Sequence, residues 1–163
     1  MARALIALGG NIGDVRATFE KAIANICGMT QGALLARSSD YATPPWGEVQ
    51  QERFINACIE IETSLDPHAL LFTMKKIETK FGRDRAKERR WGPRTLDLDL
   101  IAYDDVSMQK PELTLPHPRL FERAFVLVPL AEISPDRVIG GRSIATALAE
   151  LSTEGIERLP DPV

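Results

Sequence analysis

The sequence predicts an α+β fold in which an antiparallel sheet carries helices on one face. Apolar and polar residues alternate over 54–62 and 95–103, the period of a strand with one buried face. Over 15–26 and 70–81 the apolar residues recur at helical spacing instead. Together with two shorter apolar runs, these segments follow the order strand, helix, strand, strand, helix, strand, which is typical of a split βαβ arrangement.

The first elements are bounded by turn and cap residues. The apolar run 4–8 stops at two glycines, which predicts a buried strand and a tight turn into the first helix. Asp14 can cap that helix, because an aspartate before an apolar stripe accepts hydrogen bonds from the first free N–H groups. Residues 34–41 are predicted to form a second strand.

A stiff loop then leads into the third strand. It begins with Thr43-Pro44-Pro45-Trp46, since consecutive prolines lack N–H donors and fix φ. In the strand 54–62, the isoleucines share one face and Phe54, Asn56 and Cys58 share the other.

The second helix and the remaining elements follow from similar signals. Asp66 and a proline suit the start of a helix that runs to Gly82, and 95–103 is the fourth strand. After a turn and a Leu-Pro-His-Pro loop we expect an apolar helix over 125–133 and a last helix over 143–151.

Composition limits the class of protein. With 163 residues, 44% of them hydrophobic, the chain suits a single domain spanning 1–163 and excludes disordered and collagen-like chains. The N-terminal apolar run is too short to span a membrane and lacks a cleavage pattern, so we expect a cytoplasmic protein. Cys27 and Cys58 are expected to be free, buried thiols, and no Cys or His spacing suits zinc.

Charge is unevenly distributed along the chain. The net charge is −3, yet nine Lys and Arg residues stand against three acids over 75–94. A basic segment on an acidic chain favours one confined site for a compact anion over a surface that binds polyanions. The alternative is a solvated helix face that runs into a loop.

Two aspartates adjoin this basic segment. In a strand with Leu96, Leu98 and Leu100 on the core face, Asp97 and Asp99 lie together on the opposite face. Their repulsion must be offset by water, arginines or divalent cations, and Mg²⁺ takes one or two carboxylates together with waters and phosphates. The chain has no Walker A motif and no GxGxxG motif, so phosphates would be held by arginines and Mg²⁺.

Three segments together resemble a known enzyme family. Residues 89–99 (RRWGPRTLDLD), 43–45 (TPP) and 115–119 (LPHPR) are similar to 6-hydroxymethyl-7,8-dihydropterin pyrophosphokinase of folate biosynthesis, and the likeness extends from about residue 4 to 130. The resemblance implies a ferredoxin-like βαββαβ core with C-terminal additions. It also implies an ATP-dependent pyrophosphokinase that transfers the pyrophosphoryl group of MgATP to the pterin's hydroxymethyl oxygen and releases AMP.

The resemblance also assigns site residues. Asp97 and Asp99 would hold two Mg²⁺ ions, and Arg83 and Arg94 would contact the transferring phosphates. The nucleotide side is implied to contain Glu78, Arg85, Trp91, Arg94, Thr114, His117 and Arg123. The pterin side is implied to contain Thr43, Pro44, Pro45, Trp46, Phe54, Asn56 and Phe125, with the two phenylalanines stacking on the ring. We also expect 82–94 to close over the bound substrates as a lid.

Two other functions remain open from the residues alone. An Asp-x-Asp strand also suits a Mg²⁺-dependent nucleotidyl transferase, which would release pyrophosphate. An RNA-binding module of the same topology would use the arginine-rich loop on phosphates, but the acidic pI of about 5.5 and the lack of aromatic RNA-binding motifs argue against it. We expect no nucleic-acid or membrane partner, and a monomer that could associate with other folate enzymes.

Overall fold

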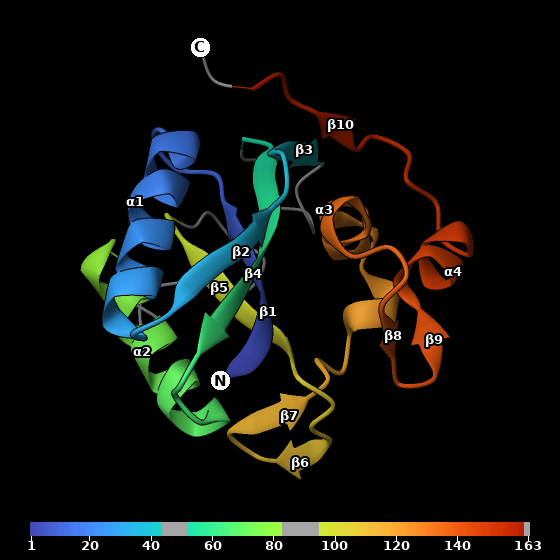
Figure 1. Cartoon of the computed structure of the whole chain (residues 1–163). Coiled ribbons are helices and arrows are strands. Elements are labelled where there is room, and N and C mark those ends of the chain that lie inside the picture. Colours follow the sequence, from blue (N-terminus) through green and yellow to red (C-terminus); the bar gives the residue numbers. More distant parts are fainter. Residues whose placement is uncertain (44–51, 83–94, 162–163) are drawn as a thin grey trace.

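The computed structural model describes residues 1–43, 52–82 and 95–161, which form one antiparallel sheet between two layers of helices (Figure 1). The sheet has six strands in the order β10-β3-β4-β1-β5, and β2 also pairs with β4. Its strands are β1 (Ala2–Gly10), β2 (Ala33–Arg37), β3 (Tyr41–Thr43), β4 (Phe54–Thr63), β5 (Asp97–Tyr103) and β10 (Glu157–Arg158). The predicted α+β class with an antiparallel sheet is confirmed.

Helices α1 (Val15–Met29) and α2 (Pro67–Lys80) cover the predicted core face. Each begins at the expected cap, because Asp14 accepts a hydrogen bond from the N–H of Ala17 and Asp66 accepts one from the N–H of Ala69. The apolar stripe of α1 and the leucines of β5 are buried in the same core cluster. The assigned pleat phase of β5 is therefore confirmed.

The opposite face of the sheet is also covered, which corrects the expectation of helices on one face only. Helices α3 (Ala124–Ile133) and α4 (Ile144–Ala149) pack there over Leu5, Cys58 and Ile101 in a second core cluster. Cys58 is fully buried, so β4 is not the half-buried strand that its alternation indicated. Alternation showed that one face is apolar, but it did not show that small residues on the other face also lie under helices.

Several local elements differ from the sequence prediction. The expected strand 34–41 is two strands, β2 and β3, and β1 continues through both glycines to Gly10 instead of ending at residue 8. A short 3₁₀ helix precedes α3, and two small hairpins and the pairing of β10 with β3 were not predicted. These further elements are β6 (Met108–Lys110), β7 (Leu113–Leu115), η1 (Leu120–Glu122), β8 (Val138–Ile139) and β9 (Arg142–Ser143).

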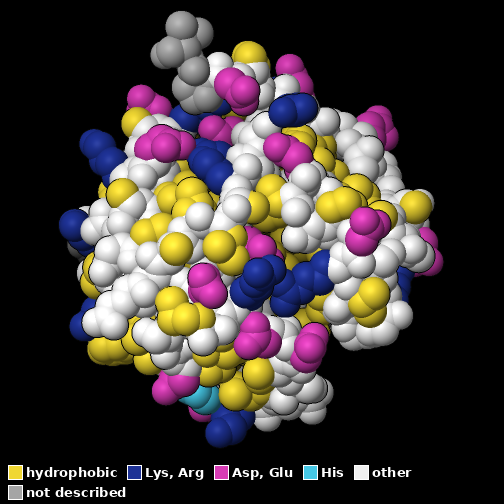
Figure 2. Space-filling model, viewed as in Figure 1, with side chains coloured by type: hydrophobic (Ala, Val, Ile, Leu, Met, Phe, Trp, Pro, Cys, Tyr) yellow, Lys and Arg dark blue, Asp and Glu magenta, His cyan; other side chains and the backbone are white. Residues whose placement is uncertain are grey.

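The surface carries charges of both signs. On the face shown in Figure 2, Lys and Arg side chains are interspersed with Asp and Glu. Within the described ranges, every helix is too short or too polar to span a lipid bilayer. Both cysteines are free thiols, as predicted, and Cys27 is half-buried.

Candidate active site

A pocket lies on the sheet face that α3 covers, next to the start of that helix. Residues from five elements or their flanks line it: Ala7, Leu8, Gly9, Thr43, Phe54, Asn56, Asp97, Asp99, Arg123, Phe125 and Val126. Seven of the residues predicted for the site therefore meet in one concave surface, although they come from distant parts of the sequence. They are Thr43, Phe54, Asn56, Asp97, Asp99, Arg123 and Phe125.

Strand register places the polar floor of the pocket in one row. Asn56 on β4 pairs with Gly9 on β1, and Gly9 pairs on its other side with Asp97 on β5. Directly paired residues in an antiparallel sheet share a face, so the amide and the carboxylate flank a position without a side chain. A Cβ at Gly9 would lie 3.0 Å from Asn56 Oδ1. Because Gly9 has no side chain, the pocket is deeper at this position than it would be with any other residue.

Gly9 was not predicted to line the pocket. A glycine pair after an apolar run is the usual signal of a strand end, so the sequence predicts a turn at this position. A glycine inside a strand can also mark the close approach of a ligand. This role depends on the pairing of β1 with β4 and β5, which the local sequence does not show.

The Asn56 amide is fixed by a neighbouring strand. It is 9% exposed, and its Nδ2 donates a hydrogen bond of 2.8 Å to Oγ1 of Thr43 on β3. Thr43 is itself buried and lines the same pocket. With one amide hydrogen used by Thr43, the second hydrogen and the carbonyl oxygen offer a donor and an acceptor to a ligand.

The carboxylates of Asp97 and Asp99 face the pocket from β5, as the period of the strand predicted. Asp99 lies 3.8 Å from Nη1 of Arg123 and 4.0 Å from Nε2 of His117. Its side chain is 33% exposed. The pocket thus has an anionic wall with cationic and imidazole groups beside it.

His117 is neutral at physiological pH. Burial, with the nearby positive charge of Arg123, lowers its pKa from 6.5 to about 4. The N–H of Arg119 donates to His117 Nδ1, so the ring proton is on Nε2, the nitrogen that faces Asp99. His117 therefore presents an N–H donor next to the carboxylates.

Two phenylalanines supply the apolar walls. Phe54 begins β4 and Phe125 follows the first residue of α3, and both line the pocket. The guanidinium of Arg123 lies 5.6 Å from the centre of the Phe125 ring. A flat, partly polar ring suits a pocket with aromatic walls and an amide at its floor.

Besides His117, two predicted nucleotide contacts lie outside the pocket lining. Glu78 on α2 is buried, and its Oε2 accepts a 2.8 Å hydrogen bond from the N–H of Leu98. Its position supports β5 from behind the aspartates. Thr114 lies in the middle of β7, opposite Gln109 of the β6–β7 hairpin.

The other predicted site residues lie outside the described residues. They are Pro44, Pro45, Trp46, Arg83, Arg85, Trp91 and Arg94. Residues 83–94, which hold most of the basic segment and of the expected lid over 82–94, are also outside the described residues.

The donors of the pocket fit Mg²⁺. Asp97 and Asp99 offer hard carboxylate oxygens on one face of a strand, and both line the pocket. No group of three His, Cys, Asp or Glu side chains suited to a metal occurs within residues 1–43, 52–82 and 95–161. A two-carboxylate set suits an ion that phosphate oxygens help to hold.

Comparison with known proteins relates this chain to one enzyme family. Residues 5–135 match the family model of 7,8-dihydro-6-hydroxymethylpterin-pyrophosphokinase (HPPK). A relative from Methylorubrum extorquens, named 2-amino-4-hydroxy-6-hydroxymethyldihydropteridine pyrophosphokinase, is 49% identical over 159 residues, which cover 98% of this chain and 99% of that protein. A relative of the same name from Pseudomonas aeruginosa is 40% identical and covers 97% of both chains.

Solved structures show a similar fold. The chain matches crystal structures of Plasmodium falciparum HPPK-DHPS, for example the wild type with pteroate, with a TM-score of 0.72 and 13% identity. The match covers 91% of this chain but only 42% of that one. The chain therefore spans less than half of these longer proteins, and at this identity the likeness concerns the fold alone.

Proposed function

Because the chain belongs to the 7,8-dihydro-6-hydroxymethylpterin-pyrophosphokinase family, we propose that its pocket is the active site of this reaction. The protein is an ATP-dependent pyrophosphokinase of folate biosynthesis, and its product is the diphosphate of 6-hydroxymethyl-7,8-dihydropterin. The observation that supports the site most directly is the convergence of Asn56, Phe125 and the Asp97/Asp99 pair on one pocket.

The pterin occupies the part of the pocket between β3, β4 and α3. Phe54 and Phe125 contact the faces of the ring, while the Asn56 amide pairs with its polar edge. The Thr43 hydroxyl sets the orientation of that amide through the 2.8 Å hydrogen bond. Pterin selection therefore depends on β3 as well as on β4.

ATP binds beside β5. Asp97 and Asp99 would hold two Mg²⁺ ions, which supply charge neutralisation for the triphosphate when they are bound. Arg123 and the Nε2–H of His117 lie near Asp99 and donate to phosphate or nucleotide oxygens. Arg83 and Arg94 are proposed to contact the transferring phosphates, and Glu78, Arg85, Trp91 and Thr114 to complete the nucleotide side.

The reaction is an in-line displacement. The hydroxymethyl oxygen attacks the β-phosphorus, the bond from that phosphorus to the α-phosphate oxygen breaks, AMP leaves, and the hydroxyl proton is released. The protein contributes positioning and stabilisation of charge.

The ferredoxin-like description of the core rests on the central strand order β3-β4-β1-β5. In this order, α1 and α2 each connect strands that do not pair with each other.

The product identifies the reaction. Purified protein is expected to form AMP from ATP only when hydroxymethyldihydropterin and Mg²⁺ are both present. Release of pyrophosphate with a nucleotidylated product would instead show the nucleotidyl transferase reaction. Salt-dependent binding of oligonucleotides without AMP formation would favour the RNA-binding alternative.

A further inference from the structure

The C-terminal segment, residues 153–161, pairs with the short strand that carries Thr43. Strand β3 has only three residues, and it would be an edge strand of the sheet without β10. Glu157 pairs with Ala42 and Arg158 pairs with Tyr41. Figure 1 shows β10 beside β3. Short edge strands open easily because one row of their backbone groups has no partner in the sheet.

Further hydrogen bonds hold the segment to β3 and to the residue just before it. The N–H of Leu159 donates to the Asp40 carbonyl oxygen at 2.9 Å, just before the strand begins. Arg53, which precedes β4, donates to the carbonyl oxygens of Ala42 at 3.2 Å and Gly155 at 3.4 Å. The segment is thus attached to β3 by its own backbone and through a shared arginine.

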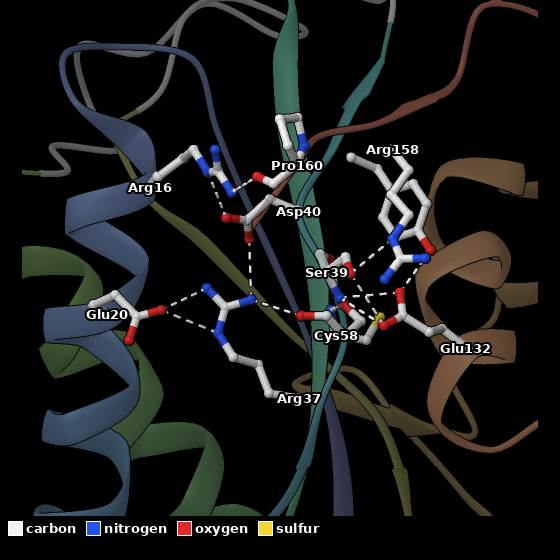
Figure 3. Close-up of polar contacts among 11 residues, drawn as sticks. Arg16, Glu20, Arg37, Ser39, Asp40, Cys58, Glu132, Arg158 and Pro160 are labelled. Atoms are coloured by element: carbon white, nitrogen blue, oxygen red, sulfur yellow. Dashed lines mark hydrogen bonds and ion pairs between the residues drawn. The ribbon is translucent and has the colours of Figure 1, made fainter. Parts of the chain in front are cut away.

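Arginines and a buried carboxylate fix the corner before β3. The Asp40 side chain is 2% exposed and lies 2.9 Å from Nε of Arg16 and 3.1 Å from Nη1 of Arg37. Arg16 also donates to the carbonyl oxygen of Pro160 at 2.6 Å, as Figure 3 shows. A buried carboxylate needs such partners, so α1, β2 and the C-terminal segment are joined at one point.

The position of β3 determines where Thr43 lies relative to the pocket residues Phe54 and Asn56. Tyr41 is opposite Asn56 and Thr43 is opposite Phe54 in the register of β3 with β4. A shift of β3 would therefore displace the Thr43 hydroxyl from the Asn56 amide, while β5 with its aspartates lies on the far side of β1. The segment also lies beyond residue 135, where the match to the family model ends.

From this geometry we infer that the C-terminal segment is a positioning element for the pterin half of the pocket. By completing β3 as an inner strand, it holds Thr43 and the Asn56 amide in the geometry that receives the pterin. The nucleotide half does not depend on it. This inference rests on the proposed function, because it takes the ligand beside Asn56 to be a pterin.

The test compares two substitutions at one position. Leu159→Pro removes the N–H that donates to Asp40, whereas Leu159→Ala keeps it and removes only the side chain. A chain that ends at residue 156 removes β10 altogether. Glu157→Gln serves as a second control, because it weakens only the exposed ion pair with Arg53.

The measurements are the Kd of hydroxymethyldihydropterin with a non-hydrolysable ATP analogue present, the Kd of the analogue itself, and KM and kcat. Leu159→Pro and the shortened chain are expected to raise the pterin Kd and KM by about fivefold, the value of one lost hydrogen bond. Analogue affinity and kcat should stay within about twofold of the wild type in every variant, and both controls should bind pterin normally.

Each other outcome is decisive. A wild-type pterin Kd in both the proline variant and the shortened chain would overturn the inference while leaving the proposed function intact. An equal loss of pterin and nucleotide affinity would show a general structural role and would also overturn it. A wild-type protein that binds no pterin would overturn the proposed function, and the inference with it.

Discussion

Replacement of Asn56 by alanine tests the division of the pocket into a pterin half and a nucleotide half. The amide is 9% exposed and one of its hydrogens is used by Thr43, so its remaining donor and its acceptor are available to the substrate. We expect Asn56→Ala to leave one or two buried polar groups of the pterin unpaired. Each costs about 1–3 kcal/mol, which gives a range of about 1–6 kcal/mol, and we expect a value of about 2–4 kcal/mol near the middle of it.

That free energy corresponds to an increase of about 30- to 1,000-fold in the pterin Kd. Fluorescence titration of the pterin, with and without a non-hydrolysable ATP analogue, would measure it. The affinity for the analogue should change by less than about twofold, and the free energy of unfolding should fall by about 1 kcal/mol through the lost hydrogen bond to Thr43.

The matched variant is Thr43→Val, which keeps the shape of the side chain and removes only the hydroxyl group that Asn56 contacts. It should raise the pterin Kd by about fivefold, because the amide remains but is no longer held. A selective loss of analogue affinity in Asn56→Ala, with normal pterin binding, would refute the assignment of this part of the pocket.

Three other predictions concern the floor, the carboxylates and the acid stability of the fold. Asp97→Ala or Asp99→Ala should reduce AMP formation by about 1,000-fold or more at saturating Mg²⁺, while the circular dichroism spectrum stays native. Wild-type activity in either variant would contradict the metal assignment. Gly9→Ala should raise the pterin Kd more than the ATP Kd, because its Cβ would lie 3.0 Å from Asn56 Oδ1, and equal effects in equilibrium titrations would disprove this. Glu132 has a pKa below its ordinary value of 4.5, because hydrogen bonds from a tyrosine hydroxyl and a backbone N–H outweigh the opposing effect of burial. The ionised Glu132 carboxylate therefore stabilises the fold above pH 4.5, and this stabilisation is lost as the pH falls through the folded-state pKa. Urea titrations should show that the difference in unfolding free energy between wild type and Glu132→Gln becomes smaller in acid.

The fold and the site could be predicted from sequence wherever the signal is local. Cap residues such as Asp14 and Asp66 act within one helical turn, so their roles are readable without tertiary structure. The alternation of Leu96, Asp97, Leu98 and Asp99 fixes which side chains share a face, since the pleat has a period of two residues. The family segments likewise indicated which side chains belong to the pocket.

Only the tertiary structure decided which elements meet. Period alone shows that a strand face is apolar, but not that α3 covers Cys58 on the opposite face. The role of Gly9 depends on register, because it is the pairing with Asn56 and Asp97 that places a missing side chain at the pocket floor. The attachment of β10 to β3 rests largely on backbone hydrogen bonds, which any residue except proline can donate, so the local sequence carries no signal for it.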